Sequence, residues 1–358
     1  MFSIFPMSYT FTVIFGATIL GLLAGLMGTF AFVRGENLVG DAISHSALPG
    51  IALAFMLFPS RNIFILTIGA AASGLCAMGI ILLITRLSKL KMDTALAMIL
   101  SVFFGTGMVF MGIIQKHFGA EQAGIESFIF GQAAAFMRSD LLVVLGAMVA
   151  IFLLVVIFFK EFQLISFDFG FAESLGLPVG KLELLLNAML IVVIVIGLQT
   201  VGVVLMSALL IGPSAASRLL TNNFVKMIGF SSLIGALSGG LGAFLSIEFL
   251  LPTGPTIVLV LMVLVILTLT FAPKTGYISK KWEQKAMAKF VRKESIIRHI
   301  LELQDGEGWT SLELLQEHRK FTHWPAGELD NRLGELVSEK RIEESAGRYR
   351  LLGKGEIE

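Results

Sequence analysis

Long apolar runs, separated by short polar connections, fill the first three quarters of the chain. A helix needs about 20 mostly apolar residues to cross the hydrocarbon core of a bilayer. Five runs meet this requirement without ambiguity, at residues 9–32, 40–58, 62–85, 93–114 and 140–159. Each of them predicts a membrane-spanning helix.

The next apolar run, residues 182–217, is too long for one ordinary crossing. Gly197 and Gly202 bracket a predicted reversal of the chain, which would divide the run into two short spans. Runs at residues 226–248 and 254–272 complete the set. We therefore predict an all-α polytopic membrane domain with about nine transmembrane helices, or eight if residues 182–217 form one span and a re-entrant piece.

Composition supports a membrane domain independently of the helix count. Hydrophobic residues make up 56% of the 358 residues, charged residues only 15%, and the mean hydropathy is +0.85. No water-soluble fold of this size could keep so much apolar surface away from water. The single cysteine, Cys76, excludes a disulfide or a cysteine metal cluster within one chain.

Lysine and arginine are unequally shared between the two sets of connections. Alternate connections, with the segment after the last span, hold 11 of them: Arg34, Arg86, Lys89, Lys91, Lys160, Lys181, Arg218, Lys226, Lys274, Lys280 and Lys281. The opposite set holds Arg61, Lys116 and Arg138. Basic residues favour the cytoplasmic side of short loops. This predicts an N-terminus outside the cell and a cytoplasmic C-terminal domain, in a bacterial plasma (inner) membrane.

Charge also marks the end of the membrane domain. Residues 1–273 contain 11 Lys/Arg and 11 Asp/Glu, whereas the much shorter remainder contains 16 and 15. We predict a transmembrane domain at residues 1–273, an amphipathic linker at 274–293 and a small α+β domain at 294–358. In this last domain, helical patterns at 294–304, 311–318 and 326–339 precede two short strands around Ala346 and Gly347. That order is typical of a winged helix.

One segment of the second span, GDAISHSALPG, carries paired polar residues. Asp41 and His45 are four apart and so project from one face of a helix, and His45 is the only histidine inside any predicted span. A carboxylate and an imidazole form half of a shell suited to manganese, ferrous iron or zinc. The alternative is that Asp41 caps the helix and His45 makes one interhelical hydrogen bond. Pro49 and Gly50 predict a kink or break in this helix.

Two connections hold further candidates. Phe167, Phe171 and Leu175 have helical spacing ahead of a stop at Gly176, which predicts a short amphipathic helix in a cytoplasmic loop. Such a helix could also lie on the membrane surface. His117 and Glu121 are four apart in a predicted external loop. They would form either a receiving site for an ion or simply a solvated surface.

Five stretches together resemble the zinc/manganese/iron permease family of ABC importers over about the first 275 residues. They are GDAISHSALPGIALAF, KMDTALAMILSVFFGTG, FKEFQLISFDFGFAESLGLPVG, VGVVLMSALLIGPSAASRLL and LPTGPTIVL, in that order. The resemblance implies a permease subunit that moves a divalent metal into the cytoplasm by alternating access. It further implies that Asp41 and His45 contact the transported metal, faced by the same pair from a second permease copy or paralogue.

The resemblance also implies two partners besides the second permease. An extracytoplasmic metal-binding protein delivers the ion, and the loop around Phe167, Asp168, Phe171, Ala172, Leu175 and Gly176 docks on a cytoplasmic ATPase. No GxxxxGK[ST] motif occurs in the sequence, so ATP hydrolysis is expected in that separate subunit and the chain itself is not expected to be an enzyme. No permanently bound cofactor is expected. Manganese or iron is favoured and zinc is possible.

Other readings remain open at this point. An ion-coupled secondary transporter could use the same pair, and a membrane-anchored metal-responsive regulator could carry the same C-terminal domain. A winged helix resembles the DNA-binding part of metal-dependent repressors. However, the helix that would enter the groove holds Glu328, Asp330, Glu335 and Glu339 against Arg332 alone. DNA phosphates require lysine and arginine, so we expect a protein-interaction or regulatory role instead.

Overall fold

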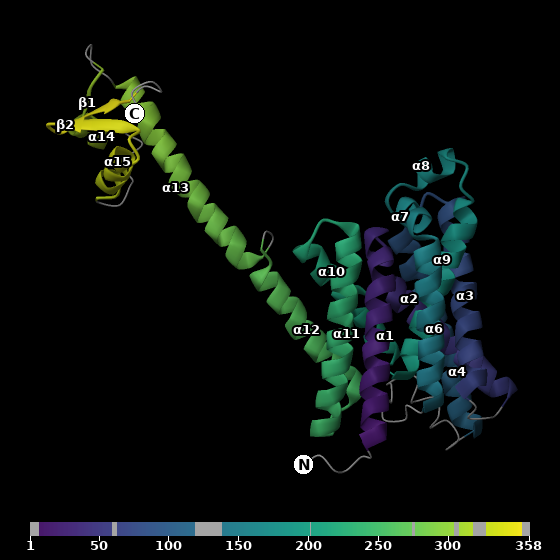
Figure 1. Cartoon of the computed structure of the whole chain (residues 1–358). Helices are drawn as coiled ribbons and strands as arrows, with labels where there is room; N and C mark the ends of the chain where they lie inside the picture. The colour runs from purple at the N-terminus through teal and green to yellow at the C-terminus, as the bar shows by residue number, and fades with distance from the viewer. Residues whose placement is uncertain are drawn as a thin grey trace. The chain divides into compact units, whose positions relative to one another are not determined.

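The computed structural model describes residues 7–58, 63–118, 138–200, 202–273, 276–303, 308–317 and 327–352 (Figure 1). The chain forms two compact units, Met1–Gly276 and Tyr277–Glu358. Each unit has its own hydrophobic core, and the two cores share no residue among those described.

The first unit is helical throughout its described residues. Its helices are α1 (Met7–Val33), α2 (Val39–Leu57), α3 (Ile63–Leu87), α4 (Met92–Phe118), α6 (Arg138–Ile157), α7 (Phe159–Phe167), α8 (Phe169–Ser174), α9 (Val179–Thr200), α10 (Val203–Leu220), α11 (Phe224–Phe249) and α12 (Thr253–Phe271). Among the described residues, seven helices are long and apolar enough to span a membrane, or eight if α6 and α7 are one span bent by 75°. The apolar part of α10, Met206–Leu220, is shorter. A count of nine spans therefore stays a prediction.

The chain breaks where the glycines predict it, between α9 and α10. Gly202 has a φ of 90°, which residues other than glycine rarely adopt, and α10 begins at the next residue. A Cβ on Gly197 would lie 2.3 Å from the sulfur of Met206. The start of α10 therefore packs directly over the end of α9.

Helices α1 and α11 run antiparallel at backbone contact. A Cβ added to Gly21 would lie 2.0 Å from the carbonyl oxygen of Gly235, and one added to Gly239 would lie 2.2 Å from that of Ala17. Small residues spaced by four permit this approach, which supplies the van der Waals contact that holds helices together in lipid.

An ion-pair cluster ties together α1, α3 and α9 at one end of the bundle. Arg34 contacts Glu36 at 2.5 Å and Glu183 at 3.4 Å, and Arg86 contacts Glu183 at 2.9 Å. Burial raises the pKa of Glu36, and the guanidinium of Arg34 opposes that shift. Helices α7 and α8 lie at this same end, opposite to the start of α1 (Figure 1). We call it the α8 end.

The second unit comprises α13 (Tyr277–Glu302), β1 (Thr310–Ser311), α14 (Leu312–Glu317), α15 (Glu328–Ser338), β2 (Ile342–Ser345) and β3 (Arg348–Leu351). The strands form one antiparallel sheet in the order β1-β3-β2. Ala346 and Gly347 both have positive φ, as a two-residue hairpin requires. The predicted helices and hairpin are present, with β1 in addition.

Helix α13 joins two segments that the sequence pattern separates. Most of the predicted linker, residues 274–293, and the predicted helix 294–304 form one continuous helix. No glycine or proline occurs between Tyr277 and Glu302 to end it. The two halves of α13 differ in burial, not in backbone conformation.

Candidate functional site

Helix α2 presents Asp41 and His45 on one face. The helix begins at Val39 after Leu38, so Asp41 is its third residue and His45 lies one turn further. The N-cap residue is Leu38 and no side chain bonds to the cap, so the capping role considered for Asp41 is not observed. Both side chains are half-buried, between fully buried neighbours such as Ala42 and Ser44.

The imidazole of His45 is held by packing alone among the described residues. The ring of Phe104, from α4, meets it edge to face with centroids 4.9 Å apart. Its Nδ1 atom is buried and has no hydrogen-bond partner in this part of the chain. The interhelical hydrogen bond considered for His45 is therefore absent at Nδ1. A buried unsatisfied nitrogen costs about 1–3 kcal/mol, a cost that an added ligand removes.

The described residues of one copy of the chain do not complete a metal site. Within the described ranges, no three or more His, Cys, Asp or Glu side chains gather where they could hold an ion. Asp41 and His45 provide at most two side chains, and manganese, iron and zinc take four to six ligands. Such an ion would need further ligands beside these two side chains.

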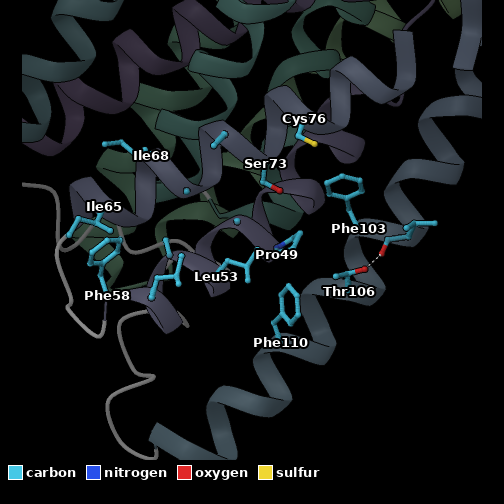
Figure 2. Close-up of a pocket in the computed structure, with 16 residues that line it drawn as sticks. Pro49, Leu53, Phe58, Ile65, Ile68, Ser73, Cys76, Phe103, Thr106 and Phe110 are labelled. Carbon is cyan, nitrogen blue, oxygen red and sulfur yellow. Dashed lines mark hydrogen bonds between the residues drawn. The ribbon is translucent and has the colours of Figure 1, made fainter. Parts of the chain in front are cut away.

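An apolar cavity of about 590 Å³ lies one turn beyond His45, between α2, α3 and α4 (Figure 2). Pro49, Leu53, Ile68, Phe103 and Phe110 form much of its wall. Its hydroxyl groups are occupied by backbone carbonyls: Ser73 donates to Ser46 at 2.6 Å and Thr106 to Val102 at 2.8 Å. These two hydroxyl groups therefore already use their protons within the protein.

Pro49 does not break α2, although the sequence predicts a kink or a break there. The helix continues from Val39 to Leu57 with Pro49 inside it. Gly50 packs against α3 so closely that a Cβ would lie 2.1 Å from the carbonyl oxygen of Gly69. This contact and the bond from Ser73 support the helix where the proline removes a backbone donor.

The predicted coupling helix is two short helices meeting at Asp168. Helix α7 ends at Phe167, and α8 begins at Phe169. The Oδ1 of Asp168, between them, accepts a 2.9 Å hydrogen bond from the backbone N–H of Phe171 and so caps the start of α8. Gly176, with a φ of 77°, follows the end of α8. The prediction of one continuous helix here is wrong, because the Asp168 side chain caps a new helix.

Four apolar side chains of this corner are exposed, although the corner is firmly anchored. Phe167, Phe169, Phe171 and Leu175 are each at least 45% exposed, and Ala172 is buried. Phe167 also packs edge to face on Phe224 of α11 at 5.3 Å, and the α7 residue Phe162 packs on Phe30 of α1. The sequence pattern identified three of these four exposed residues and missed Phe169. We call the four the coupling face.

The predicted pair of His117 and Glu121 is described only at His117. The Nδ1 atom of His117, in the last turn of α4, lies 2.9 Å from the carbonyl oxygen of Ile113 in the same helix. Glu121 lies outside the described residues. A receiving site there stays a prediction.

Comparison with known proteins gives consistent matches. The profile of the ABC 3 transport family matches residues 7–272. The manganese transport system membrane protein MntC of Bacillus subtilis (strain 168) is 40% identical over 291 residues, covering 81% of this chain and 67% of that protein. The zinc transport system membrane protein TroC of Treponema pallidum (strain Nichols) is 39% identical over 277 residues, covering 77% and 93%.

A solved structure agrees in fold. The chain is similar to PsaBC from Streptococcus pneumoniae in complex with Fab, with a TM-score of 0.65 and 35% sequence identity. The similarity covers 75% of this chain and 94% of that chain.

Proposed function

The chain belongs to the ABC 3 transport family, and from that premise we propose that it is the membrane permease subunit of an ABC importer for manganese. Oxygen and nitrogen ligands such as Asp41 and His45 suit manganese, iron and zinc alike. The name of the Bacillus subtilis relative specifies manganese and that of the Treponema pallidum relative zinc. Manganese is therefore the proposed cargo, and zinc and iron are the competitors that uptake experiments must include.

The observation that carries this proposal is the incomplete pair on α2. A metal ion that must be released cannot be held in a closed shell, and Asp41 with His45 provides only part of one. The Asp41 carboxylate would offset the charge of the ion in a low-dielectric path, and the unpartnered Nδ1 of His45 would gain a ligand. The same pair from a second permease copy or paralogue would complete the shell.

The coupling face is the proposed contact with a cytoplasmic ATPase. Its exposed phenylalanines lie on α7 and α8, and α7 is packed against α1 through Phe162 and against α11 through Phe167. A push on α7 and α8 would therefore be transmitted to the long helices and could reverse access to the Asp41/His45 pair. An extracytoplasmic metal-binding protein would deliver the ion at the opposite end.

The topology proposed for the chain has nine spans and a cytoplasmic α8 end. Arg34 and Arg86 gather there in the ion-pair cluster, consistent with the excess of basic residues in that set of connections. The N-terminus then lies outside and the second unit inside the cell. Neither a secondary transporter nor a membrane-anchored regulator gains support from the family match.

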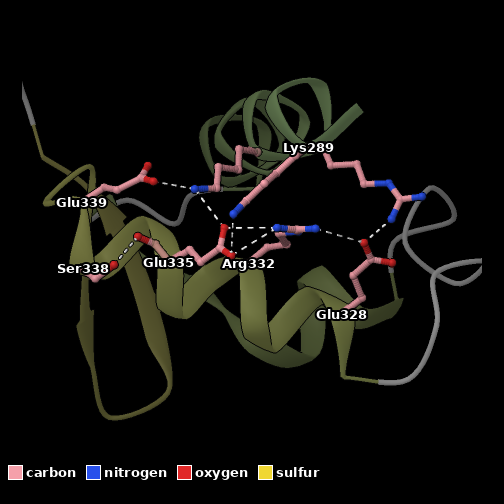
Figure 3. A network of polar contacts seen from close by, with 8 residues as sticks. Lys289, Glu328, Arg332, Glu335, Ser338 and Glu339 are labelled. Carbon is pink, nitrogen blue, oxygen red and sulfur yellow. Dashed lines mark hydrogen bonds and ion pairs between the residues drawn. The ribbon is translucent and has the colours of Figure 1, made fainter. Parts of the chain in front are cut away.

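The second unit is proposed as a winged-helix-like interaction domain that does not bind DNA. Three glutamates in and just after α15 pair with α13: Glu335 contacts Lys289 and Lys293 at 2.9 Å, Glu339 contacts Lys293, and Glu328 contacts Arg292 (Figure 3). The residues that α15 exposes fully include Asp330, Asn331, Gly334 and Ser338. An exposed helix face without lysine or arginine cannot neutralise phosphates.

Uptake measurements test the proposed site. In cells that lack other importers, Asp41→Ala and His45→Ala should each abolish manganese uptake at an unchanged level of protein in the membrane. Asp93→Ala is the matched control, because it removes an exposed carboxylate from the first turn of α4. Normal uptake of manganese, zinc and iron by the Asp41→Ala/His45→Ala double variant would refute the assignment.

A further inference from the structure

The first half of α13 lies outside the described core of the second unit. Every residue from 280 to 292 is exposed, whereas Ile296, Ile297 and Ile300 in the second half are buried in the core of the second unit. The exposed half nevertheless carries large apolar side chains. Trp282 is 74% exposed and Phe290 58%. Such side chains rarely remain in water on so short a stretch of helix without a partner.

The apolar and basic residues of this half form two adjacent stripes. Trp282, Ala286 and Phe290 recur every four residues, and Lys281, Lys285 and Lys289 recur with the same spacing one residue earlier. Residues spaced by four lie on one face of a helix, and a shift of one residue moves the stripe by about 100°. An apolar stripe beside a lysine stripe is the pattern of helices that lie in the surface of a membrane.

The position of α13 in the chain also points to the membrane surface. Only residues 272–276 separate the end of the apolar helix α12 from the start of α13. At about 3.5 Å per residue, this connection keeps the first turn of α13 within roughly 20 Å of the end of α12. Tyr277 and Trp282 are of the types enriched at the membrane–water boundary, and both are exposed.

We propose that residues 277–290 of α13 bind the anionic headgroups of the membrane surface, with Trp282 and Phe290 inserted and Lys281 and Lys285 contacting phosphates. Lys289, near the end of this segment, is left out of the phosphate contacts because its Nζ already contacts Glu335 of α15 at 2.9 Å. The two lysines nearer the membrane carry the charge complementarity. Each lysine near an anionic surface strengthens binding by on the order of fivefold. This inference rests on α12 spanning a membrane and is independent of the transported ion.

Spin labelling of the full chain in nanodiscs tests the proposal. Cys76→Ser removes the native cysteine, and Phe290→Cys then places one nitroxide on the apolar stripe. Ala288→Cys is the matched control, an exposed position on the opposite face of the same helix. In discs of phosphatidylcholine mixed with phosphatidylglycerol, oxygen should enhance the spin relaxation of the label at 290, and a water-soluble nickel chelate should not. The label at 288 should show the reverse.

Lipid charge and lysine variants give the remaining outcomes. Discs of phosphatidylcholine alone, or Lys281→Gln/Lys285→Gln, should lower the equilibrium constant for the shielded state by on the order of thirtyfold, and Lys281→Arg/Lys285→Arg should retain it. Equal nickel accessibility at 290 and 288 in all discs would overturn the proposal. So would shielding of the label at 290 from both oxygen and nickel whatever the lipid, because a protein surface, from a second copy or an ATPase, would then be the occupant.

Discussion

At the scale of single residues, the site contains a histidine whose ring packs edge to face on Phe104. Spacing along one helix is enough to place Asp41 and His45 together, so the sequence alone could predict the pair. Phe104 could not be predicted, because it approaches from α4 and no pattern in the sequence links it to His45. The unsatisfied Nδ1 atom is likewise a property of the packed structure.

Removing the ring that packs on His45 should weaken transport without unfolding the protein. In Phe104→Ala the imidazole loses an edge-to-face contact worth about 0.5–1.5 kcal/mol and gains rotamers that point away from the ion. We expect manganese uptake to fall by about two- to tenfold, following from that energy. Val102→Ala, at an exposed neighbouring position of α4, should leave uptake unchanged. Equal uptake by both variants would show that Phe104 does not position His45.

Glu335 should make the second unit sensitive to acid. Hydrogen bonds from Lys293 and Lys289 lower the pKa of Glu335 from 4.5 to about 2. A lowered pKa in the folded state contributes stability that is present above pH 4.5 and is lost as the pH falls from 4.5 to about 2. The melting temperature of the second unit should therefore fall in this window, and fall less in Glu335→Gln.

Tryptophan fluorescence follows this melting in the full chain, because Trp282, Trp309 and Trp324 all belong to the second unit. Glu283→Gln is the control, since Glu283 is an exposed carboxylate of α13 that lies before Lys289, where the described ion pairs with α15 begin. An identical acid profile for Glu335→Gln and the unchanged protein would contradict the role of this carboxylate.

At the scale of helices and strands, prediction succeeded where one property dominates a segment and failed where a single side chain redirects the backbone. Hydropathy locates the long helices, and glycine locates the break between α9 and α10. The apolar spacing of Phe167, Phe171 and Leu175 continues through Asp168, so it could not show that this side chain ends one helix and caps the next. Strand β1 has only two residues, too few for any pattern.

The contact between α1 and α11 gives a prediction at this scale. In Gly21→Ala the new methyl group would overlap the carbonyl oxygen of Gly235 and force the two helices apart. Overpacking typically costs 1–3 kcal/mol, so we expect a loss of about 2 kcal/mol in the free energy of unfolding. Denaturation in detergent, followed by circular dichroism, measures it.

Gly79→Ala is the matched control for that substitution. A Cβ on Gly79, in the middle of α3, meets no other atom within 4 Å. Replacing a helical glycine by alanine in open space should gain up to about 1 kcal/mol. The two substitutions are therefore expected to have opposite signs, and a stabilising Gly21→Ala would contradict the close packing of α1 on α11.

At the scale of the whole molecule, the chain combines a transport unit with a separately packed second unit. The family profile ends at residue 272, close to the boundary between the two units at Gly276. Ile296, Leu333 and Tyr349 belong to the core of the second unit, and none of them contributes to the core around α1 and α2. The permease unit is therefore expected to fold without the rest of the chain.

A stop codon after Gly276 tests this independence. The truncated chain keeps α1 to α12, the Asp41/His45 pair and the coupling face, so it should reach the membrane and still take up manganese in cells that lack other importers. Asp41→Ala in the truncated chain should abolish that uptake, which shows that the remaining signal passes through the same site. Because the two cores share no described residue, the melting temperature of the helical unit in detergent should be unchanged by the truncation. If the truncated chain melts at a lower temperature or transports nothing at a normal level in the membrane, the second unit is required by the permease and its role is more than that of an added interaction domain.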